Sequence, residues 1–262
     1  MSETDGDIRV EQRGHVLLIG IDRPKKLNGF SAKMLVQLSE AYDRLERDSS
    51  LRCGLLHSVG PHFTAGVQLD QIGPWFAEGR HASAPGKVDP FDLFAPLRSK
   101  PVVVAVQGIC FTVGIELMLA ADIVVAAEDS RFGQIEVRRG IFANHGGCLR
   151  IVERAGWGNA MRYLLTGDEF DAATALRLGL VQEVVPVGQQ FGRALQLAER
   201  IAQQAPLAVM QTIRSARTGI FHGWPAAAAD FGPAQAVLMQ TEDAAEGLRS
   251  FAEKRDGDFT GR

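Results

Sequence analysis

Residues 100–127 of the chain, KPVVVAVQGICFTVGIELMLAADIVVAA, decide its fold class. Val102–Val106 is an unbroken apolar run rich in β-branched residues, which is typical of a strand covered on both faces. A helical segment follows at about residues 114–121, and Ile123–Ala127 is a second apolar strand. A buried strand, a helix and another buried strand in direct succession predict an α/β core.

The sequence before this stretch adds further strands and helices. Residues 8–12 and 15–21 have strand patterns and are joined at a glycine turn, which predicts a hairpin. Ser31 is a candidate N-cap for a helix that runs to about residue 47, and residues 51–58 form a short apolar strand. Residues 73–100 are rich in Gly, Pro, Ala and Ser, and we expect them to form a mobile insertion with a short helix.

Helical patterns dominate from Gly146 onward. We expect helices at about residues 147–155, 158–165, 171–178, 189–204, 206–218 and 233–254. Strand and helix alternate through the first two-thirds of the chain, where ββα units recur. The sequence therefore predicts an α/β core followed by a helical C-terminal module.

Composition excludes several classes of protein. The formal net charge of the 262 residues is −3, so no basic field favours nucleic acid. The three cysteines have the spacing of neither a disulfide framework nor a zinc site, and the histidines have no metal-binding spacing. The polar start shows no secretory or transit signal, and no apolar run is long enough to span a membrane. We expect a soluble, cytoplasmic protein with no nucleic-acid, membrane or metal partner.

Glu116 is the first candidate for chemistry because it lies in the first turn of an apolar helix. In one interpretation its carboxylate complements the helix dipole or pairs with an arginine. In the other, its apolar neighbours Ile115 and Leu117 desolvate the carboxylate and raise its pKa toward that of a general base.

Glu136 is a second acid between apolar neighbours, on a segment that we expect to be extended. It either pairs with Arg138 or Arg139, or forms an acid/base pair with Glu116. Both alternatives stay open at this point, because composition does not place two distant side chains together in space.

Two glycine-rich loops follow strands, at residues 60–67 and 108–114. Neither has the sequence of a Walker A or dinucleotide-binding loop. The backbone N–H groups of Val67 and Val113 are candidates to stabilise a developing oxyanion, and a plain turn is the alternative. His145 lies beside two glycines with no Ser or Cys motif to pair with, so we expect it to lie in a loop or to cap a helix.

Five motifs are distributed over nearly the whole chain. They are DRPKKLN at residues 22–28, FTAGVQ at 63–68, KPVVVAVQG at 100–108 followed by GIEL at 114–117, RFGQIE at 131–136 followed by Gly146-Gly147, and an LTG…A…GLV segment at 165–181. In this order and spacing they resemble motifs of the enoyl-CoA hydratase/isomerase (crotonase) family. The resemblance implies a crotonase-type spiral of repeated ββα units with a C-terminal helical oligomerisation module.

The same resemblance implies roles for five residues. Glu116 and Glu136 match the two catalytic glutamates, which together hold a water molecule. Glu116 acts as base on that water and Glu136 delivers a proton to the α-carbon, so that a trans-2-enoyl-CoA becomes a 3-hydroxyacyl-CoA. The N–H groups of Val67 and Val113 match the oxyanion hole, and the N–H of Asn144 matches a contact to the attacking water.

Substrate binding and assembly are also implied by the resemblance. Residues that match positions binding substrate or coenzyme A are Lys25, Lys26, Ala65, Gly66, Gly114 and Lys254, the last reaching from a neighbouring subunit. The chain is then expected to form a homotrimer or a dimer of trimers, with a core at residues 1–190 and a trimerisation module at 191–262. Coenzyme A is part of the substrate, and no other cofactor and no metal is called for.

The sequence departs from the family pattern at three places. Thr112-Val113 stands where the family has glycines, Gln68 and Asp70 replace an acid and a basic residue, and residues 143–145 (Ala-Asn-His) replace a segment that contains Pro-Gly. These departures keep other functions open. Isomerisation, retro-aldol cleavage and acyl-CoA hydrolysis can use the same oxyanion hole, and a non-catalytic acyl-CoA-binding protein would need neither glutamate.

Overall fold

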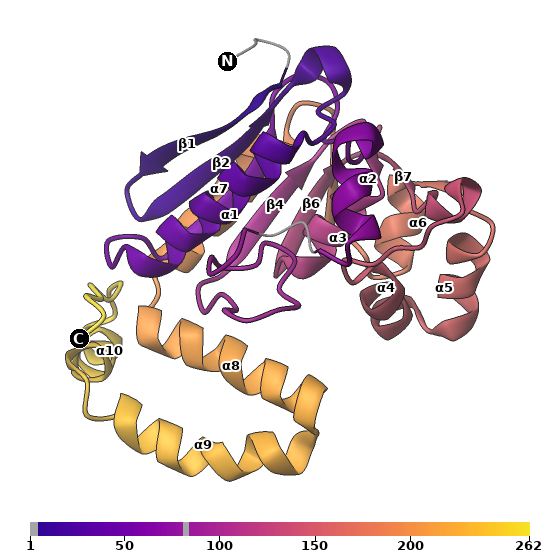
Figure 1. Cartoon of the computed structure of the whole chain (residues 1–262). Coiled ribbons are helices and arrows are strands. Elements are labelled where there is room, and N and C mark those ends of the chain that lie inside the picture. Colours follow the sequence, from indigo (N-terminus) through magenta and orange to yellow (C-terminus); the bar gives the residue numbers. More distant parts are fainter. Residues whose placement is uncertain (1–4, 81–83) are drawn as a thin grey trace.

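A six-stranded sheet forms the centre of the molecule in the computed structural model, which describes residues 5–80 and 84–262 (Figure 1). Its strand order is β1-β2-β3-β4-β6-β9. The strands are β1 (Asp7–Arg13), β2 (Val16–Asp22), β3 (Cys53–Ser58), β4 (Val102–Val106), β6 (Ile123–Ala127) and β9 (Glu183–Val185). The hairpin of β1 and β2 is antiparallel, as predicted, and all other neighbours in this sheet are parallel.

Both faces of β4 are covered, which confirms the prediction from its apolar run. Val102, Val104 and Val106 belong to the core shared with α1 (Ala32–Arg47). Val103 and Ala105 belong to a second core on the opposite face, formed with α7 (Gln190–Ala202). Alternate residues of one strand therefore enter two separate cores.

A smaller sheet has the order β5-β7-β8 and contains β5 (Ile109–Phe111), β7 (Arg131–Gly133) and β8 (Glu169–Asp171). Single parallel bridges extend this pattern toward the N-terminus, from Phe30 to Val67 and from Thr64 to Cys110. Successive turns of the chain thus each contain a long strand, a short extended segment and a helix. This repetition confirms the predicted ββα spiral.

Helices follow the short extended segments and complete each turn of the spiral. They are η1 (Pro24–Lys26), α1, α2 (Leu69–Ala77), α3 (Val113–Ala120), η2 (Glu136–Arg139), α4 (Gly147–Ala155), α5 (Trp157–Leu164) and α6 (Ala172–Arg177). Ser31 caps α1 as predicted, since its side chain accepts a hydrogen bond from the Met34 N–H at 3.2 Å.

The C-terminal helices are α8 (Pro206–His222), α9 (Trp224–Leu238) and α10 (Glu242–Glu253). Figure 1 shows α8 and α9 side by side, apart from the large sheet, with α10 at the end of this arm. In contrast, α7 packs directly on β3, β4 and β6.

Several predicted boundaries were wrong. The single helix expected at residues 233–254 is two helices, because Thr241 caps a new helix by accepting a hydrogen bond from the Ala244 N–H at 3.0 Å. The helix within the expected insertion, α2, begins at Leu69, before residue 73, and residues 81–83 of that insertion lie outside the described residues. The strands β5, β7, β8 and β9 were not predicted, since three-residue strands carry little periodicity.

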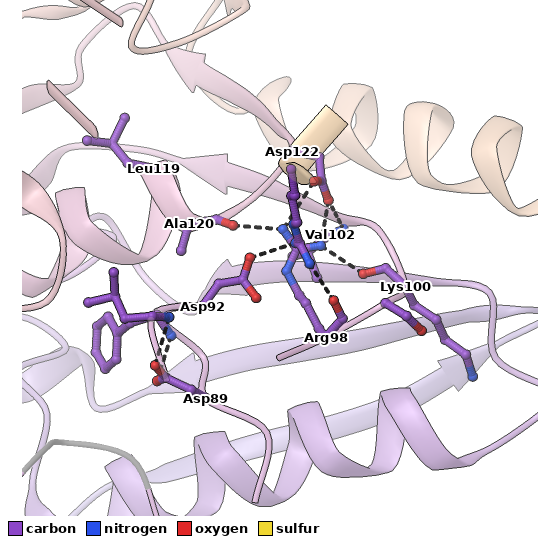
Figure 2. A network of polar contacts seen from close by, with 12 residues as sticks. Asp89, Asp92, Arg98, Lys100, Val102, Leu119, Ala120 and Asp122 are labelled. Carbon is purple, nitrogen blue, oxygen red and sulfur yellow. Dashed lines mark hydrogen bonds and ion pairs between the residues drawn. The ribbon is translucent and has the colours of Figure 1, made fainter. Parts of the chain in front are cut away.

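Buried polar contacts hold residues 89–100 against the core (Figure 2). The guanidinium of Arg98 donates to the carbonyls of Lys100 and Ala120 and pairs with Asp122 at 2.7 Å. Asp89 accepts hydrogen bonds from the N–H groups of Phe91, Leu93 and Phe94, each at 3.0 Å. The backbone turn around Phe91 is therefore fixed, and the Phe91 ring packs on that of His145, with centroids 4.5 Å apart.

Candidate active site

A cavity of about 480 Å³ lies where α3, η2 and the loops beside them meet. Most of its lining is apolar, and two carboxylates face it. The lining residues are Ala65, Val67, Leu69, Phe76, Thr112, Val113, Glu116, Ile135, Glu136, Arg139, Gly140, Ile141, Phe142, Asn144 and His145. A mainly apolar pocket with a few converging polar groups is typical of a small-molecule site.

Glu116 occupies the first turn of α3, as predicted, and only 2% of its surface is exposed. Its Oε1 atom accepts hydrogen bonds from the N–H groups of His145 at 2.7 Å and Gly147 at 3.1 Å. Among the described residues Glu116 forms no ion pair with an arginine, so the arginine interpretation is not supported. Burial, and then repulsion by Glu136, raises the pKa of Glu116 to about 7, against the effect of the two N–H donors.

The approach of the Gly147 N–H to Glu116 depends on the absence of a side chain at position 147. A Cβ atom there would lie 2.7 Å from Nε2 of Gln134, 3.0 Å from the Ala143 Cβ and 3.2 Å from Oε1 of Glu116. Gly147 thus lets the backbone of α4 contact the carboxylate directly.

Glu136 begins the short helix η2, so the prediction of an extended segment was wrong. Gln134 donates from Nε2 to Oε1 of Glu136 at 3.2 Å, and Oε2 of Glu136 is buried with no hydrogen-bond partner among the described residues. Arg138 pairs with Asp168 at 3.2 Å, and the Arg139 side chain donates a hydrogen bond to the Arg138 carbonyl at 3.5 Å. The expected ion pair to Glu136 is therefore absent from the described contacts, and burial raises the pKa of Glu136 to about 7.

The register of the small sheet explains why two distant glutamates line one cavity. Phe111 of β5 pairs with Gly133 of β7, and the N–H of Thr112 donates to the Gly133 carbonyl at 2.9 Å. The helix that carries Glu116 leaves β5 directly after this pair, and the turn that carries Glu136 leaves β7 at the same edge. Because neighbouring parallel strands end at one edge, both carboxylates face the same space.

Val67 and Val113, whose backbone amides are the predicted oxyanion donors, also line this cavity. Phe30 bonds to both neighbours of Val67, donating to the Gly66 carbonyl at 2.8 Å and accepting from the Gln68 N–H at 2.9 Å. The N–H of Val67 therefore points away from Phe30. Val113 is the first residue of α3, where backbone N–H groups have no partner within the helix.

Close packing holds these two amides beside each other. A Cβ atom on Gly66, which has φ +117°, would lie 2.5 Å from Oγ1 of Thr112. Thr112 itself has φ +50° and ψ −115°, a conformation that a β-branched residue rarely adopts. A threonine thus stands in a backbone conformation suited to glycine, at the residue before Val113.

The remaining predicted site residues fall into two groups. Ala65 and Asn144 line the cavity, while Gly66 and Gly114 pack behind its wall, where a Cβ on Gly114 would lie 2.6 Å from Cγ2 of Thr64. Lys25, Lys26 and Lys254 do not line it. Lys254 follows α10, which Figure 1 shows well apart from α3 within one chain.

Two polar residues of the site were missed by the sequence analysis. His145 lies in a loop, as expected, but it also lines the cavity beside Glu116 and is buried. Gln134 is buried and bonds to Glu136. A polar residue between buried apolar positions was the available signal for Gln134, and the resemblance that placed the neighbouring Asn144 at the water was the available signal for His145.

Neither a metal cluster nor a membrane span is found in the part of the chain that the structure describes. No three of its His, Cys, Asp and Glu side chains are grouped so that they could hold a metal ion. Over the same residues, none of the helices combines the length and the apolar character needed to cross a bilayer.

Comparison with known proteins gives consistent matches over the chain. The sequence model of a family described as enoyl-CoA hydratase/isomerase matches residues 11–262. The chain is 35% identical to enoyl-CoA hydratase EchA19 of Mycobacterium tuberculosis, over 99% of this chain and 98% of that protein. It is 32% identical to 2,3-dehydroadipyl-CoA hydratase of Escherichia coli, over 98% and 99%. A crystal structure of enoyl-CoA hydratase from M. tuberculosis H37Rv superposes with a TM-score of 0.88 at 37% identity, covering 99% of this chain and all of that one.

Proposed function

The chain belongs to the enoyl-CoA hydratase/isomerase family, and we propose that it adds water to the double bond of a trans-2-enoyl-CoA to give a 3-hydroxyacyl-CoA. The observation that carries this proposal is the pair of buried carboxyl groups, Glu116 and Glu136, which face one cavity that Val67 and Val113 also line.

The two amides supply the electrostatic part of the reaction. In the proposed complex the thioester carbonyl oxygen accepts hydrogen bonds from the N–H groups of Val67 and Val113. Negative charge develops on this oxygen when hydroxide adds to C3 and the thioester becomes an enolate. Removing one donor from such a site costs about 3–4 kcal/mol of transition-state stabilisation.

The two carboxyl groups supply the proton transfers. Glu116, as carboxylate, takes a proton from water while the water oxygen bonds to C3, and Glu136, as carboxylic acid, gives its proton to C2. This division requires one ionised and one neutral group. Two buried acids whose pKa values are both raised to about 7 satisfy it, because their mutual repulsion favours a state with one shared proton.

Roles for the other predicted residues follow from this reaction. The N–H of Asn144 would hold the attacking water. Ala65, Gly66 and Gly114 would shape the binding site of the thioester, and Lys25 and Lys26 would contact coenzyme A along the rim. Coenzyme A enters as part of the substrate, with no separate cofactor.

We also propose a homotrimer or a dimer of trimers, assembled through the C-terminal helices. No described residue of α8 is buried, and large apolar side chains on the arm are exposed, with Trp224 and Phe251 each 85% accessible. Lys254 would then reach the coenzyme A of a neighbouring subunit. The division into residues 1–190 and 191–262 stays a prediction, and the packing of α7 on the sheet favours a boundary after that helix. The cytoplasmic location also stays a prediction.

An assay of the purified protein with trans-2-enoyl-CoAs of four to sixteen carbons tests the reaction. Loss of the conjugated enoyl-thioester absorbance is expected for the wild type, and we expect it to fall at least 100-fold in both Glu116→Gln and Glu136→Gln. Glu128→Gln changes an exposed glutamate away from the cavity and serves as the matched control. Absence of loss at every chain length, from folded protein that binds coenzyme A, would exclude hydration.

Isomerisation of a 3-enoyl-CoA is the second candidate, because one acid can move a proton between C2 and C4. The buried oxygen of Glu136 that has no partner is the observation in its favour. Formation of the conjugated thioester from 3-enoyl-CoA, lost in Glu136→Gln and retained in Glu116→Gln, would identify this reaction.

A further inference from the structure

The His145 side chain packs against two phenylalanine rings beside the cavity. Only 3% of its surface is exposed. Its ring centroid lies 4.5 Å from that of Phe91 and 5.5 Å from that of Phe76. Phe76 belongs to α2, and Phe91 belongs to the segment that Asp89 fixes. Two separate parts of the chain thus hold the imidazole in one place.

Both oxygens of the Glu116 carboxyl group face this residue. The backbone N–H of His145 donates to Oε1 at 2.7 Å, and its ring atom Nδ1 lies 3.7 Å from Oε2. Both side chains are nearly inaccessible to solvent, with 4% and 2% of their surface exposed. Two titratable groups at this separation, shielded from water, interact strongly because the surroundings screen their charges poorly.

We propose that His145 is a positioning residue for Glu116, and that its imidazole and the Glu116 carboxyl group titrate as a coupled pair. The kinetic form of this proposal rests on the proposed function, since Glu116 is the base of that reaction. Imidazolium beside Glu116 favours the carboxylate, which is the form that accepts a proton from water. His145 thereby sets the pH below which the base is lost.

Other titratable groups lie on the described elements next to the pair. They are Glu136 on η2, Cys148 and Arg150 on α4, Asp89 and Asp92 on the segment that carries Phe91, and Asp70 and Glu78 in and after α2. Of these, Arg150 favours the ionised form of Glu116 and Glu136 opposes it. Arg150 also donates to the Asp92 carbonyl at 3.0 Å. His145 differs from all of them because it contacts Glu116 through both its backbone and its ring.

A titration of the ligand-free protein tests the coupling without any assumption about the reaction. Histidine labelled with ¹³C at Cε1 reports each imidazole by NMR, and His145→Gln identifies the resonance. We expect the titration midpoint of His145 to fall by at least one pH unit in Glu116→Gln, because the carboxylate that favours imidazolium is gone. His57, which packs on Phe191 with ring centroids 4.9 Å apart, provides the internal control and should titrate as before. A His145 midpoint that moves by less than 0.2 pH units would overturn the proposal.

The pH dependence of kcat/KM gives the reciprocal measurement, because it reports the ionisation of the free enzyme. His145→Gln and His145→Phe should move the acid limb to higher pH by the same amount that the NMR midpoint moves, since the coupling of two sites is mutual. The His145→Phe variant keeps an aromatic ring between Phe76 and Phe91. If the acid limb depended only on this packing, it would stay at the wild-type pH in His145→Phe. His57→Gln is the matched variant and should leave the profile unchanged. If no enoyl-CoA is hydrated, the proposed function is wrong, and the NMR titration still tests the coupling. If enoyl-CoA is hydrated and the acid limb does not move in either His145 variant, the kinetic role of His145 is refuted.

Discussion

At the scale of single residues, the site depends on how tightly backbone groups approach Glu116. Gly147 is the position where this dependence is most direct, since its N–H contacts Oε1 and no Cβ fits beside Gln134 and Ala143. The family motif predicts a glycine here, and the structure supplies the physical reason for it.

Gly147→Ala should therefore lower kcat about 10- to 100-fold while the protein remains folded. The added Cβ displaces the Glu116 carboxylate or Gln134 by a few tenths of an ångström, and reaction geometry is sensitive to such shifts. Gly158→Ala is the matched control, because a Cβ on Gly158 of α5 meets no atom within 4 Å. Equal activity of the two variants would contradict the proposed role of the Gly147 contact.

From the raised pKa of Glu136 we predict how the free energy of unfolding depends on pH. A carboxyl group whose pKa is raised from 4.5 to about 7 on folding contributes stability that is fully present below pH 4.5 and is lost as the pH rises through 7. The Glu136→Gln variant has no charge to bury. Its free energy of unfolding relative to the wild type should therefore rise by about 1–3 kcal/mol between pH 4.5 and pH 8. Urea unfolding at both pH values measures this, with Glu128→Gln as the control. A difference that does not depend on pH would show that Glu136 ionises as freely in the folded protein as in the unfolded chain.

At the scale of elements, the turn between β5 and α3 combines a functional amide with an unfavourable backbone conformation. Thr112 has φ +50°, and the family has glycines in this turn. Holding a non-glycine residue in such a region costs on the order of 1–3 kcal/mol. The conformation aligns the start of α3, so that the Val113 N–H lies at the cavity.

Thr112→Gly should raise the free energy of unfolding by about 1 kcal/mol, because glycine adopts positive φ without strain and this gain exceeds its cost in chain entropy. Thermal or urea unfolding checks the sign. Thr218→Gly in α8, where the backbone is helical, should instead lower stability by about 1 kcal/mol. Destabilisation by both substitutions would mean that the Thr112 side chain contributes more than its backbone strain costs.

At the scale of the whole molecule, the C-terminal arm exposes apolar side chains that the spiral core does not cover. Trp224, Phe251, Phe231 and Leu248 are all more than half exposed in one chain. Several large apolar side chains exposed on one part of a molecule are typical of an interaction surface.

We predict that Trp224→Glu combined with Phe251→Asp reduces the assembly to a single chain of 28.4 kDa. A charge placed in a buried apolar contact removes burial free energy and adds a desolvation cost. Sedimentation or light scattering gives the mass, and Val187→Asp, on an exposed loop of the core, is the control. A wild-type protein that is already monomeric at micromolar concentration would refute the predicted trimer.

Much of the fold was predictable because its signals are local. The buried run of β4, the N-cap at Ser31 and the helix that carries Glu116 each follow from a few adjacent residues. The break at Thr241 was also local, since a capping residue followed by two acids begins α10, and it was missed because one long apolar pattern spans both helices.

By itself the sequence determined the fold family, the α/β alternation and the identity of Glu116 and Glu136 as candidates, since these depend on local patterns and ordered motifs. Only the tertiary structure decided that the two glutamates face one cavity, that Glu136 has no arginine partner among the described contacts, and that His145 lies against Glu116. The reason is that desolvation and electrostatic coupling depend on distances between segments far apart in the chain. Those distances are set by the register of β5 on β7 and by the packing of α2 and the Phe91 turn, neither of which a local pattern encodes.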